Sequence, residues 1–143
     1  MPIEPSSLDR YLSEARAALE RVTPVDAYAA MRHGAVLIDI RPEFQRRRDG
    51  EIPGAIIIER NHLEWRLHPD SPARISEATS PDVRWIVLCD EGYASSLAAA
   101  TLQALGLHRA TDVVGGLRAW RSAGLPLGTP GQVSAPRLAP ESD

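Results

Sequence analysis

The only cysteine of the chain, Cys89, stands at the end of an apolar run and directly before a loop, in the stretch VLCDEGYASSLAAA (residues 87–100). Gly92 can adopt a positive φ, so this loop can curl with its backbone N–H groups turned inward. A helix predicted to begin near Ala94–Ser96 adds free amides and the positive end of its dipole. Such donors stabilise a thiolate, and they could also hold an anion or a persulfide. The pattern suits a nucleophilic cysteine, although a small buried apolar residue at a strand end would look the same.

Two acids, Asp90 and Glu91, follow Cys89 directly, although positive neighbours would favour a thiolate. Two unit charges about 4 Å apart interact by about 1 kcal/mol in water and about 4 kcal/mol near a protein surface. Carboxylates folded over the sulfur would therefore cancel much of the effect of the amides. We expect both side chains to point outward and form a rim, because the loop N–H groups occupy the interior. Arg60, after a predicted strand, and the run Arg46–Arg48 could offset the rim charge.

The composition is that of a soluble globular protein and excludes several other chemistries. The 143 residues fit one domain, and a net charge of −3 gives no indication of a nucleic-acid-binding face. The longest uncharged apolar runs are far too short to span a bilayer. All 16 basic residues are arginine, so lysine Schiff-base chemistry is excluded.

The cysteine and histidine content predicts no disulfide, no metal and no cofactor. One cysteine cannot form an internal disulfide or a thiolate zinc cluster. The histidines are scattered, and no pair has the i, i+4 spacing of the helical zinc motif: His33, His62, His68 and His108. A free thiol, together with an N-terminal stretch that lacks an apolar signal segment, predicts a cytoplasmic protein without membrane attachment.

Apolar patterning predicts strands that alternate with helices. Apolar runs rich in branched residues, typical of buried parallel strands, occur at residues 35–40, 55–58 and 84–89, with shorter extended stretches at 21–23 and 112–116. Helices are predicted over residues 5–20, 24–33, 61–67, 95–105 and 117–123. The alternation predicts an α/β fold with a mostly parallel sheet, in which sites lie beyond the carboxyl ends of the strands. Asp39 and Cys89 both stand at such ends.

Four separated pieces of the chain occur in the order and spacing of one known family. They are the strand with D-x-R in LIDIRP, the turn GEIPGA, the strand, cysteine loop and helix in IVLCDEGYASSLAA, and the segment VVGGLRAWRSAGLPL. Together they resemble the rhodanese (sulfurtransferase) family, and the loop with IERNHLEWRL is similar to a subgroup of single-domain members. The resemblance covers residues 21–127. It leaves an N-terminal helical extension, residues 1–20, and a C-terminal tail, residues 128–143, which we expect to be flexible.

The resemblance implies a five-stranded parallel sheet with helices on both faces, to which the N-terminal helix is added. It also implies a sulfurtransferase that takes sulfane sulfur from thiosulfate or a persulfide donor. A cysteine persulfide would then pass the sulfur to cyanide or a thiol, in a two-step covalent mechanism. The expected partners are a small sulfur-containing substrate and a thiol or protein acceptor, without nucleic acid or membrane. We expect a monomer or a weak homodimer.

On the matched positions, the resemblance makes Cys89 the nucleophile. The backbone N–H groups that would cradle its outer sulfur are those of Asp90, Glu91, Gly92, Tyr93, Ala94 and Ser95. Arg60 is the arginine that we expect to contact the substrate. Asp39 and Arg41 match the family's D-x-R, and we expect these two side chains to tie loops together beneath the site.

The loop departs from the family pattern in two ways. Ala94 stands where many members carry Arg or another hydrogen-bonding residue, and the rim is acidic. We hypothesise that Asp90 and Glu91 disfavour the dianion thiosulfate and select another sulfur donor or a cationic partner surface. A phosphatase of the Cys-x5-Arg type is disfavoured because Ser95 stands where its arginine would be. A non-catalytic module that binds a protein or senses redox state remains open, because folds outlive their chemistry.

Overall fold

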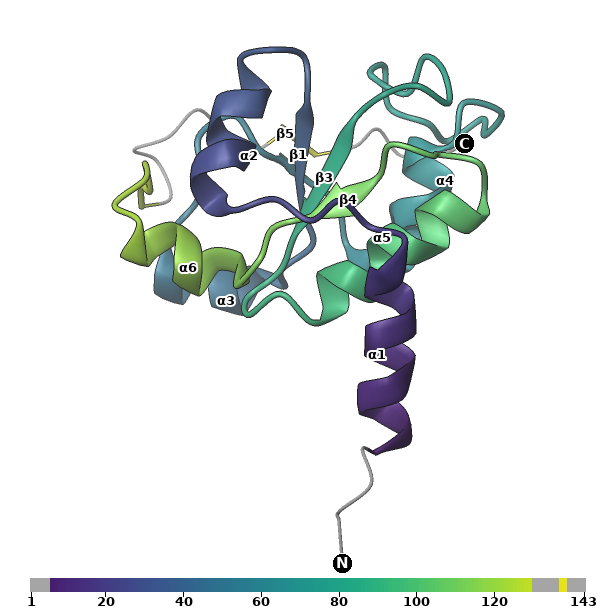
Figure 1. Ribbon diagram of the computed structural model, residues 1–143. Coiled ribbons are helices and arrows are strands. Elements are labelled where there is room, and N and C mark those ends of the chain that lie inside the picture. The colour runs from purple at the N-terminus through teal and green to yellow at the C-terminus, as the bar shows by residue number, and fades with distance from the viewer. Residues whose placement is uncertain (1–5, 130–136, 139–143) are drawn as a thin grey trace, which may run out of the picture.

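The computed structural model describes residues 6–129 and 137–138, and its centre is a parallel sheet with the strand order β4-β3-β1-β2-β5. β1 pairs with β3 over four residues, with Ile38 opposite Val87. The strands are β1 (Val36–Asp39), β2 (Ile56–Ile57), β3 (Trp85–Leu88), β4 (Thr111–Asp112) and β5 (Arg137–Leu138). Helices connect the strands and lie on both sides of the sheet (Figure 1), as the alternation in the sequence predicts.

Two buried clusters lie on opposite faces of the sheet, because successive side chains of a strand point to opposite sides. On β1, Ile38 joins the cluster that α4 and α5 cover, whereas Leu37 joins the cluster that α2 and α6 cover. These helices are α2 (Pro24–Met31), α4 (Leu63–Leu67), α5 (Ala94–Ala104) and α6 (Gly116–Ser122). Between the first two strands, the chain adds α3 (Glu43–Asp49), and a 3-10 turn, η1 (Arg60–His62), leads into α4.

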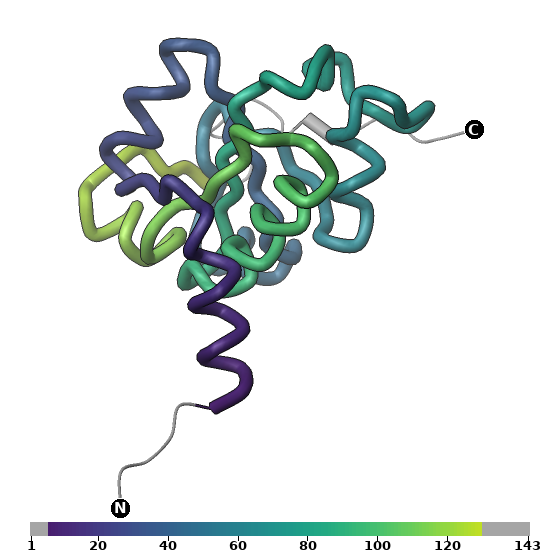
Figure 2. The backbone as a smooth tube through the Cα atoms, turned by 45° about the vertical axis from the view of Figure 1, so that its right-hand side comes forward, coloured from purple at the N-terminus to yellow at the C-terminus, as the bar shows by residue number. Residues whose placement is uncertain are grey.

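The predicted N-terminal helix is α1 (Ser7–Ala17), which begins where the Ser6 hydroxyl accepts a hydrogen bond from the N–H of Asp9 at 3.0 Å. It projects away from the rest of the molecule in both views (Figures 1 and 2), and none of its residues is buried. Leu8 is 70% exposed, whereas Leu19, after the helix, packs against the α4/α5 cluster. The chain therefore reaches the core just after α1, at Leu19.

The prediction of five strands within residues 21–127 is wrong, because this stretch supplies four. The extended stretch at residues 21–23 makes only a single parallel bridge, between Val22 and Val113. It ends there because Thr23 caps α2, its hydroxyl accepting from the N–H of Asp26 at 3.2 Å, and Pro24 starts the helix. The sheet has a fifth strand, β5, which pairs with β2.

β5 belongs to the stretch 128–143, which the sequence predicts to be a flexible tail. Gly128 forms an antiparallel bridge with Glu51, and the Gly128 N–H donates to the Glu51 carbonyl at 2.9 Å. The chain is described again only in β5, so residues 130–136 and 139–143 of the predicted tail lie outside the described residues.

Candidate functional site

The sulfur of Cys89 lies at the carboxyl end of β3, enclosed by the loop that follows it. Gly92 has a φ of +90°, and a Cβ atom there would lie 2.9 Å from the backbone nitrogen of Gly115, so the loop requires glycine. The Cys89 Sγ accepts hydrogen bonds from the N–H of Gly92 at 3.1 Å and from that of Ser95 at 3.4 Å. Two loop amides therefore point at a sulfur atom that is nearly buried.

A pocket of about 310 Å³ opens at this sulfur. Its walls come from the carboxyl ends of three neighbouring strands, because Arg41 follows β1, Arg60 follows β2 and Cys89 follows β3. The lining residues are Ile40, Arg41, Pro42, Gln45, Arg60, Cys89, Asp90, Glu91, Tyr93 and Ala94. Most of the predicted site residues are thus brought together, as expected for a doubly covered parallel sheet.

The two rim acids share one arginine that the sequence analysis did not single out. Arg118, near the start of α6, forms ion pairs with Asp90 at 3.3 Å and with Glu91 at 3.2 Å. The acids also contribute to the wall of the Cys89 pocket. The rim is therefore less negative than the loop sequence alone indicates, because a cation from a distant segment offsets part of its charge.

Asp39 and Arg41 form a buried ion pair beside the pocket, and both are only 1% exposed. The Arg41 Nη2 donates to Asp39 Oδ2 at 2.8 Å and to the carbonyl of Gly50 at 2.9 Å. Arg41 thus links the end of β1 to the end of α3. Its Nη1 is buried without a hydrogen-bond partner among the described residues.

The other arginines expected near the rim pair with acids of their own neighbourhood. Arg60 forms an ion pair with Glu64 at 2.9 Å while lining the pocket. The run Arg46–Arg48 does not line the pocket: its side chains pair with Glu51, Glu43 and Asp49 in turn. The hydrogen bond from Arg48 lowers the pKa of Asp49.

Behind the sulfur lies a buried carboxylate that sequence reasoning missed. Asp112, on β4, is 0% exposed and accepts a hydrogen bond from the Ser95 hydroxyl at 2.7 Å. The Ser96 hydroxyl donates to the same oxygen at 2.8 Å, and the Arg21 Nε donates to the other oxygen at 2.8 Å. The only signal in the sequence is a charged residue at the start of the predicted extended stretch 112–116, where burial of the charge would be costly unless it is paired.

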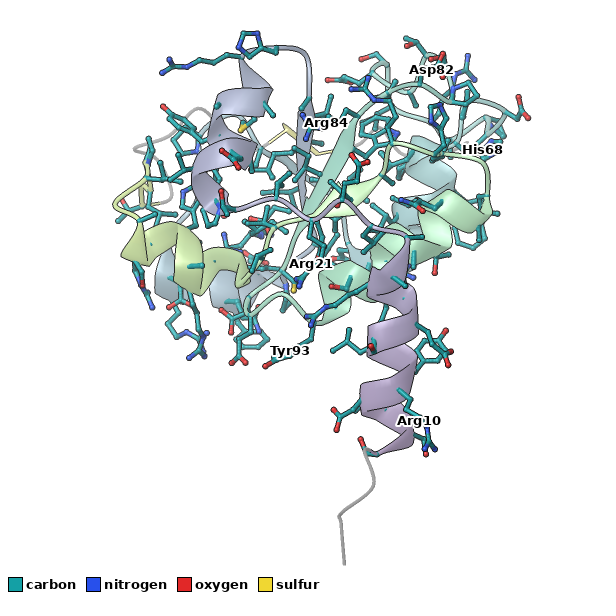
Figure 3. All side chains as sticks on the ribbon, in the orientation of Figure 1. Arg10, Arg21, His68, Asp82, Arg84 and Tyr93 are labelled. Carbon is teal, nitrogen blue, oxygen red and sulfur yellow. The ribbon has the colours of Figure 1, made fainter. Side chains whose placement is uncertain are left out.

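Two arginines from the N-terminal region hold the loop carbonyl of Gly92. Arg16 Nη2 donates to this oxygen at 2.7 Å and Arg21 Nη2 at 3.1 Å. The Arg16 guanidinium also lies over the ring of Tyr93, 5.6 Å from its centroid. Figure 3 shows Arg21 and Tyr93 in the region where α1 joins the rest of the molecule. The N-terminal helix therefore reaches the cysteine loop through one residue of its last turn.

The start of α6 supports the loop from the opposite side. The N–H of Leu117 donates to the carbonyl of Cys89 at 2.9 Å, and the N–H of Arg118 donates to that of Asp90 at 3.2 Å. These carbonyls are therefore engaged by α6 while loop amides point at the sulfur.

Within the part of the chain that the structure describes, no group of three or more His, Cys, Asp or Glu side chains could hold a metal ion. No helix in that part is long and apolar enough to cross a membrane.

Comparisons with known proteins find a matching family model and curated relatives that share one name. The family model of the rhodanese-like domain matches residues 23–123. The thiosulfate sulfurtransferase GlpE of Pseudomonas entomophila (strain L48) is 33% identical over 103 residues, which cover 72% of this chain and 85% of the relative. The GlpE protein of Stutzerimonas stutzeri (strain A1501) is 33% identical over 102 residues, 71% of this chain and 84% of the relative.

Solved structures show the same fold. A protein of unknown function from Rhodopseudomonas palustris CGA009, described as a possible tyrosine phosphatase, superposes with a TM-score of 0.76 at 35% identity, over 89% of this chain and 98% of the other. The polysulfide-sulfur transferase homodimer of Wolinella succinogenes superposes with a TM-score of 0.68 at 24% identity, over 82% and 84% of the two chains. Its likeness at that identity concerns the fold alone. From the family match and the curated relatives, the chain belongs to the rhodanese-like domain family.

Proposed function

We propose that this protein is a sulfurtransferase in which Cys89 carries the transferred sulfur as a persulfide. The observation that supports it most is the sulfur of Cys89, which lies in the wall of a pocket while two backbone N–H groups point at it. These donors stabilise the thiolate that attacks a sulfur donor. The relatives named thiosulfate sulfurtransferase support the same reaction class.

With thiosulfate as the donor, the Cys89 thiolate attacks the outer sulfur of the dianion. The new bond joins the two sulfur atoms, the bond from the outer sulfur to the sulfonate breaks, and sulfite leaves with the electron pair. The enzyme then carries a persulfide anion. Cyanide or a thiolate attacks its outer sulfur, forms thiocyanate or a new persulfide, and returns the Cys89 thiolate. No external oxidant or reductant is needed, because sulfane sulfur is passed on at constant oxidation state.

The pocket walls point to a donor other than thiosulfate as the better substrate. Arg41 and Arg60 are paired with acids, and the two rim carboxylates share Arg118. Thiosulfate, a dianion, would therefore meet the rim carboxylates, while the arginines near it are already paired with acids of the protein. A persulfide donor carries less charge near the reacting sulfur, and a protein donor could present basic residues to the rim.

Mass spectrometry of the intact protein tests the function. After incubation with thiosulfate or glutathione persulfide, we expect a gain of one sulfur atom that cyanide removes as thiocyanate. The adduct must be absent in C89S. If no donor loads the protein, the enzyme proposal is wrong and a binding module takes its place. Accumulation of sulfenic acid or a glutathione mixed disulfide would instead identify a redox sensor.

A phosphatase activity is not supported by the loop, although one similar structure is described as a possible tyrosine phosphatase. The position of the phosphate-binding arginine holds Ser95, and its hydroxyl is bonded to the carboxylate of Asp112 at 2.7 Å. A phosphoryl group would thus meet a serine that is hydrogen-bonded to a carboxylate, where a phosphatase offers a guanidinium with two parallel hydrogen bonds. An assay with p-nitrophenyl phosphate beside the sulfur-loading assay separates the two activities.

A further inference from the structure

The carboxylate of Asp112 is fully buried beneath the cysteine loop and receives hydrogen bonds from three side chains. Ser95 and Ser96 donate to Oδ2 at 2.7 Å and 2.8 Å. Arg21 donates from Nε to Oδ1 at 2.8 Å and from Nη2 to Oδ2 at 3.2 Å. Only one of these donors, Ser95, also contacts the sulfur, with its Oγ 3.3 Å from the Cys89 Sγ.

The number of hydrogens decides the direction of this contact. A serine hydroxyl carries one hydrogen, and a carboxylate in an ion pair only accepts. The 2.7 Å contact of Ser95 with Asp112 has the short length of a charge-assisted bond, so the hydrogen of Ser95 points at the carboxylate. The Ser95 oxygen then turns a lone pair toward Cys89. A thiol can donate to that lone pair, whereas a thiolate cannot.

We infer that Asp112 is a positioning residue that acts on Cys89 through Ser95, by holding the serine hydrogen away from the sulfur. Asp112 thereby opposes the two loop amides: it favours the neutral thiol, and it makes the thiolate, once formed, a stronger nucleophile. Nucleophilic strength rises with the basicity of a thiolate, so the two effects belong together. This role deepens the sulfurtransferase function proposed above, on which its biological meaning rests.

The remaining charged or titratable groups of the site are the same in every comparison below. Beneath and beside the loop, and in the pocket wall, they are Arg16, Arg21, Arg41, Arg60, Asp90, Glu91, Tyr93 and Arg118. No hydrogen bond from any of them to the sulfur is described, although Arg21 bonds both Asp112 and the Gly92 carbonyl and so ties the carboxylate to the loop. Substitutions at the two serines leave all of these groups in place.

The test is the pH dependence of alkylation by iodoacetamide, which reports on a single site because the chain has one cysteine. In S95A, we expect the midpoint of the alkylation profile to fall by about one pH unit. The plateau rate should fall about threefold, because the thiolate becomes less basic. S95T should restore both values. If S95A instead raises the midpoint or leaves it unchanged, Ser95 donates to the sulfur or does not act on it, and the inference is wrong.

The control is S96A, because Ser96 bonds the same oxygen of Asp112 and makes no described contact with Cys89. Its hydroxyl also lies 3.2 Å from the Gly92 carbonyl and accepts from Arg16 Nε at 2.9 Å, so S96A perturbs the carboxylate and the loop without touching the sulfur. We expect its alkylation midpoint to stay at the wild-type value. A shift in S96A as large as that in S95A would mean that any change around the carboxylate moves the thiol, which removes the specific role of Ser95.

Asp112→Asn reverses the hydrogen-bond chain. Arg21 Nε would hold the amide oxygen at the Oδ1 position, so the amide NH2 group would donate to Ser95 and free its hydrogen for the sulfur. We expect the midpoint to fall in D112N and to move much less when S95A is already present. Equal shifts in both backgrounds would mean that the charge alone acts, which overturns the route through Ser95. Circular dichroism checks that D112N folds. If it does not fold, the S95A and S96A profiles alone test the inference. Alkylation needs no sulfur transfer, so failure here is distinct from failure of the proposed function.

Discussion

Gly116 packs against the backbone of Cys89 so closely that a Cβ atom at Gly116 would lie 2.4 Å from the Cys89 carbonyl oxygen. The same atom would lie 2.6 Å from the carbonyl oxygen of Asp90. The Gly-Gly pair at the start of α6 is therefore part of the wall that shapes the cysteine loop. The atoms that Gly116 approaches are backbone, which cannot move without moving the sulfur.

Gly116→Ala should damage the loop more than the fold. Gly116 has a φ of +59°, so alanine adds strain of about 1–2 kcal/mol, and the overlap with two carbonyls adds about 1–3 kcal/mol. We expect persulfide formation to fall at least about tenfold, measured by intact mass. Gly124→Ala is the matched control, because Gly124 has a φ of +72° and an added Cβ atom there would meet no described atom within 4 Å. Equal losses of sulfur loading in both variants would contradict this role.

Neutralising the rim should improve the use of thiosulfate. In the double variant D90N/E91Q, we expect catalytic efficiency with thiosulfate to rise about fivefold at low salt, which corresponds to about 1 kcal/mol of relieved repulsion. The increase should shrink at high salt mainly through Glu91, because its side chain is 47% exposed whereas that of Asp90 is 16% exposed, and salt screens buried charges much less. R118Q should act in the opposite direction, since it removes the cation shared by both acids. An unchanged efficiency in the double variant would remove the electrostatic argument for donor selection.

The contact from α1 to the loop predicts that the N-terminal helix supports activity. Arg16→Ala removes the 2.7 Å bond to the Gly92 carbonyl and the contact with Tyr93. We expect about a fivefold lower rate of sulfur loading and faster hydrogen exchange of the loop amides, because a partly buried charged hydrogen bond contributes about 1–2 kcal/mol. E14Q, an exposed change on the same helix, should behave like wild type. Wild-type exchange rates in R16A would show that α1 does not hold the loop.

The buried ion pair at the D-x-R motif should be a structural requirement. Asp39→Asn leaves the guanidinium of Arg41 buried without its carboxylate, and we expect about 3–5 kcal/mol less stability in urea denaturation. E43Q breaks the exposed pair with Arg47, in which the arginine is 73% and the glutamate 64% exposed, and should cost less than about 0.5 kcal/mol. If both variants unfold at the same urea concentration, the buried pair contributes no more to the stability of the fold than the exposed pair.

Local patterns were sufficient for the features that are contiguous in the chain. The loop from Cys89 to Ser95 needs a strand end, a glycine with positive φ and a helix start, and all three stand next to one another. The same holds for the capped start of α2, where Thr23 and Pro24 act within one turn. The strand that the resemblance implies at residues 21–23 does not form, because the helix cap at Thr23 ends the extended stretch after the bridge at Val22.

The sequence by itself therefore determined the nucleophile candidate, the shape of its loop and the α/β order of elements, since these depend on neighbours in the chain. Only the tertiary structure decided which charges reach the loop. Arg21 meets Asp112 across 91 positions, and Arg16 meets Gly92 across 76. Arg118 reaches the rim acids from α6, whereas the run Arg46–Arg48 is used by nearby acids. Long side chains pair with whatever the packing of β4, α1 and α6 brings within about 3 Å, and no local pattern encodes that distance.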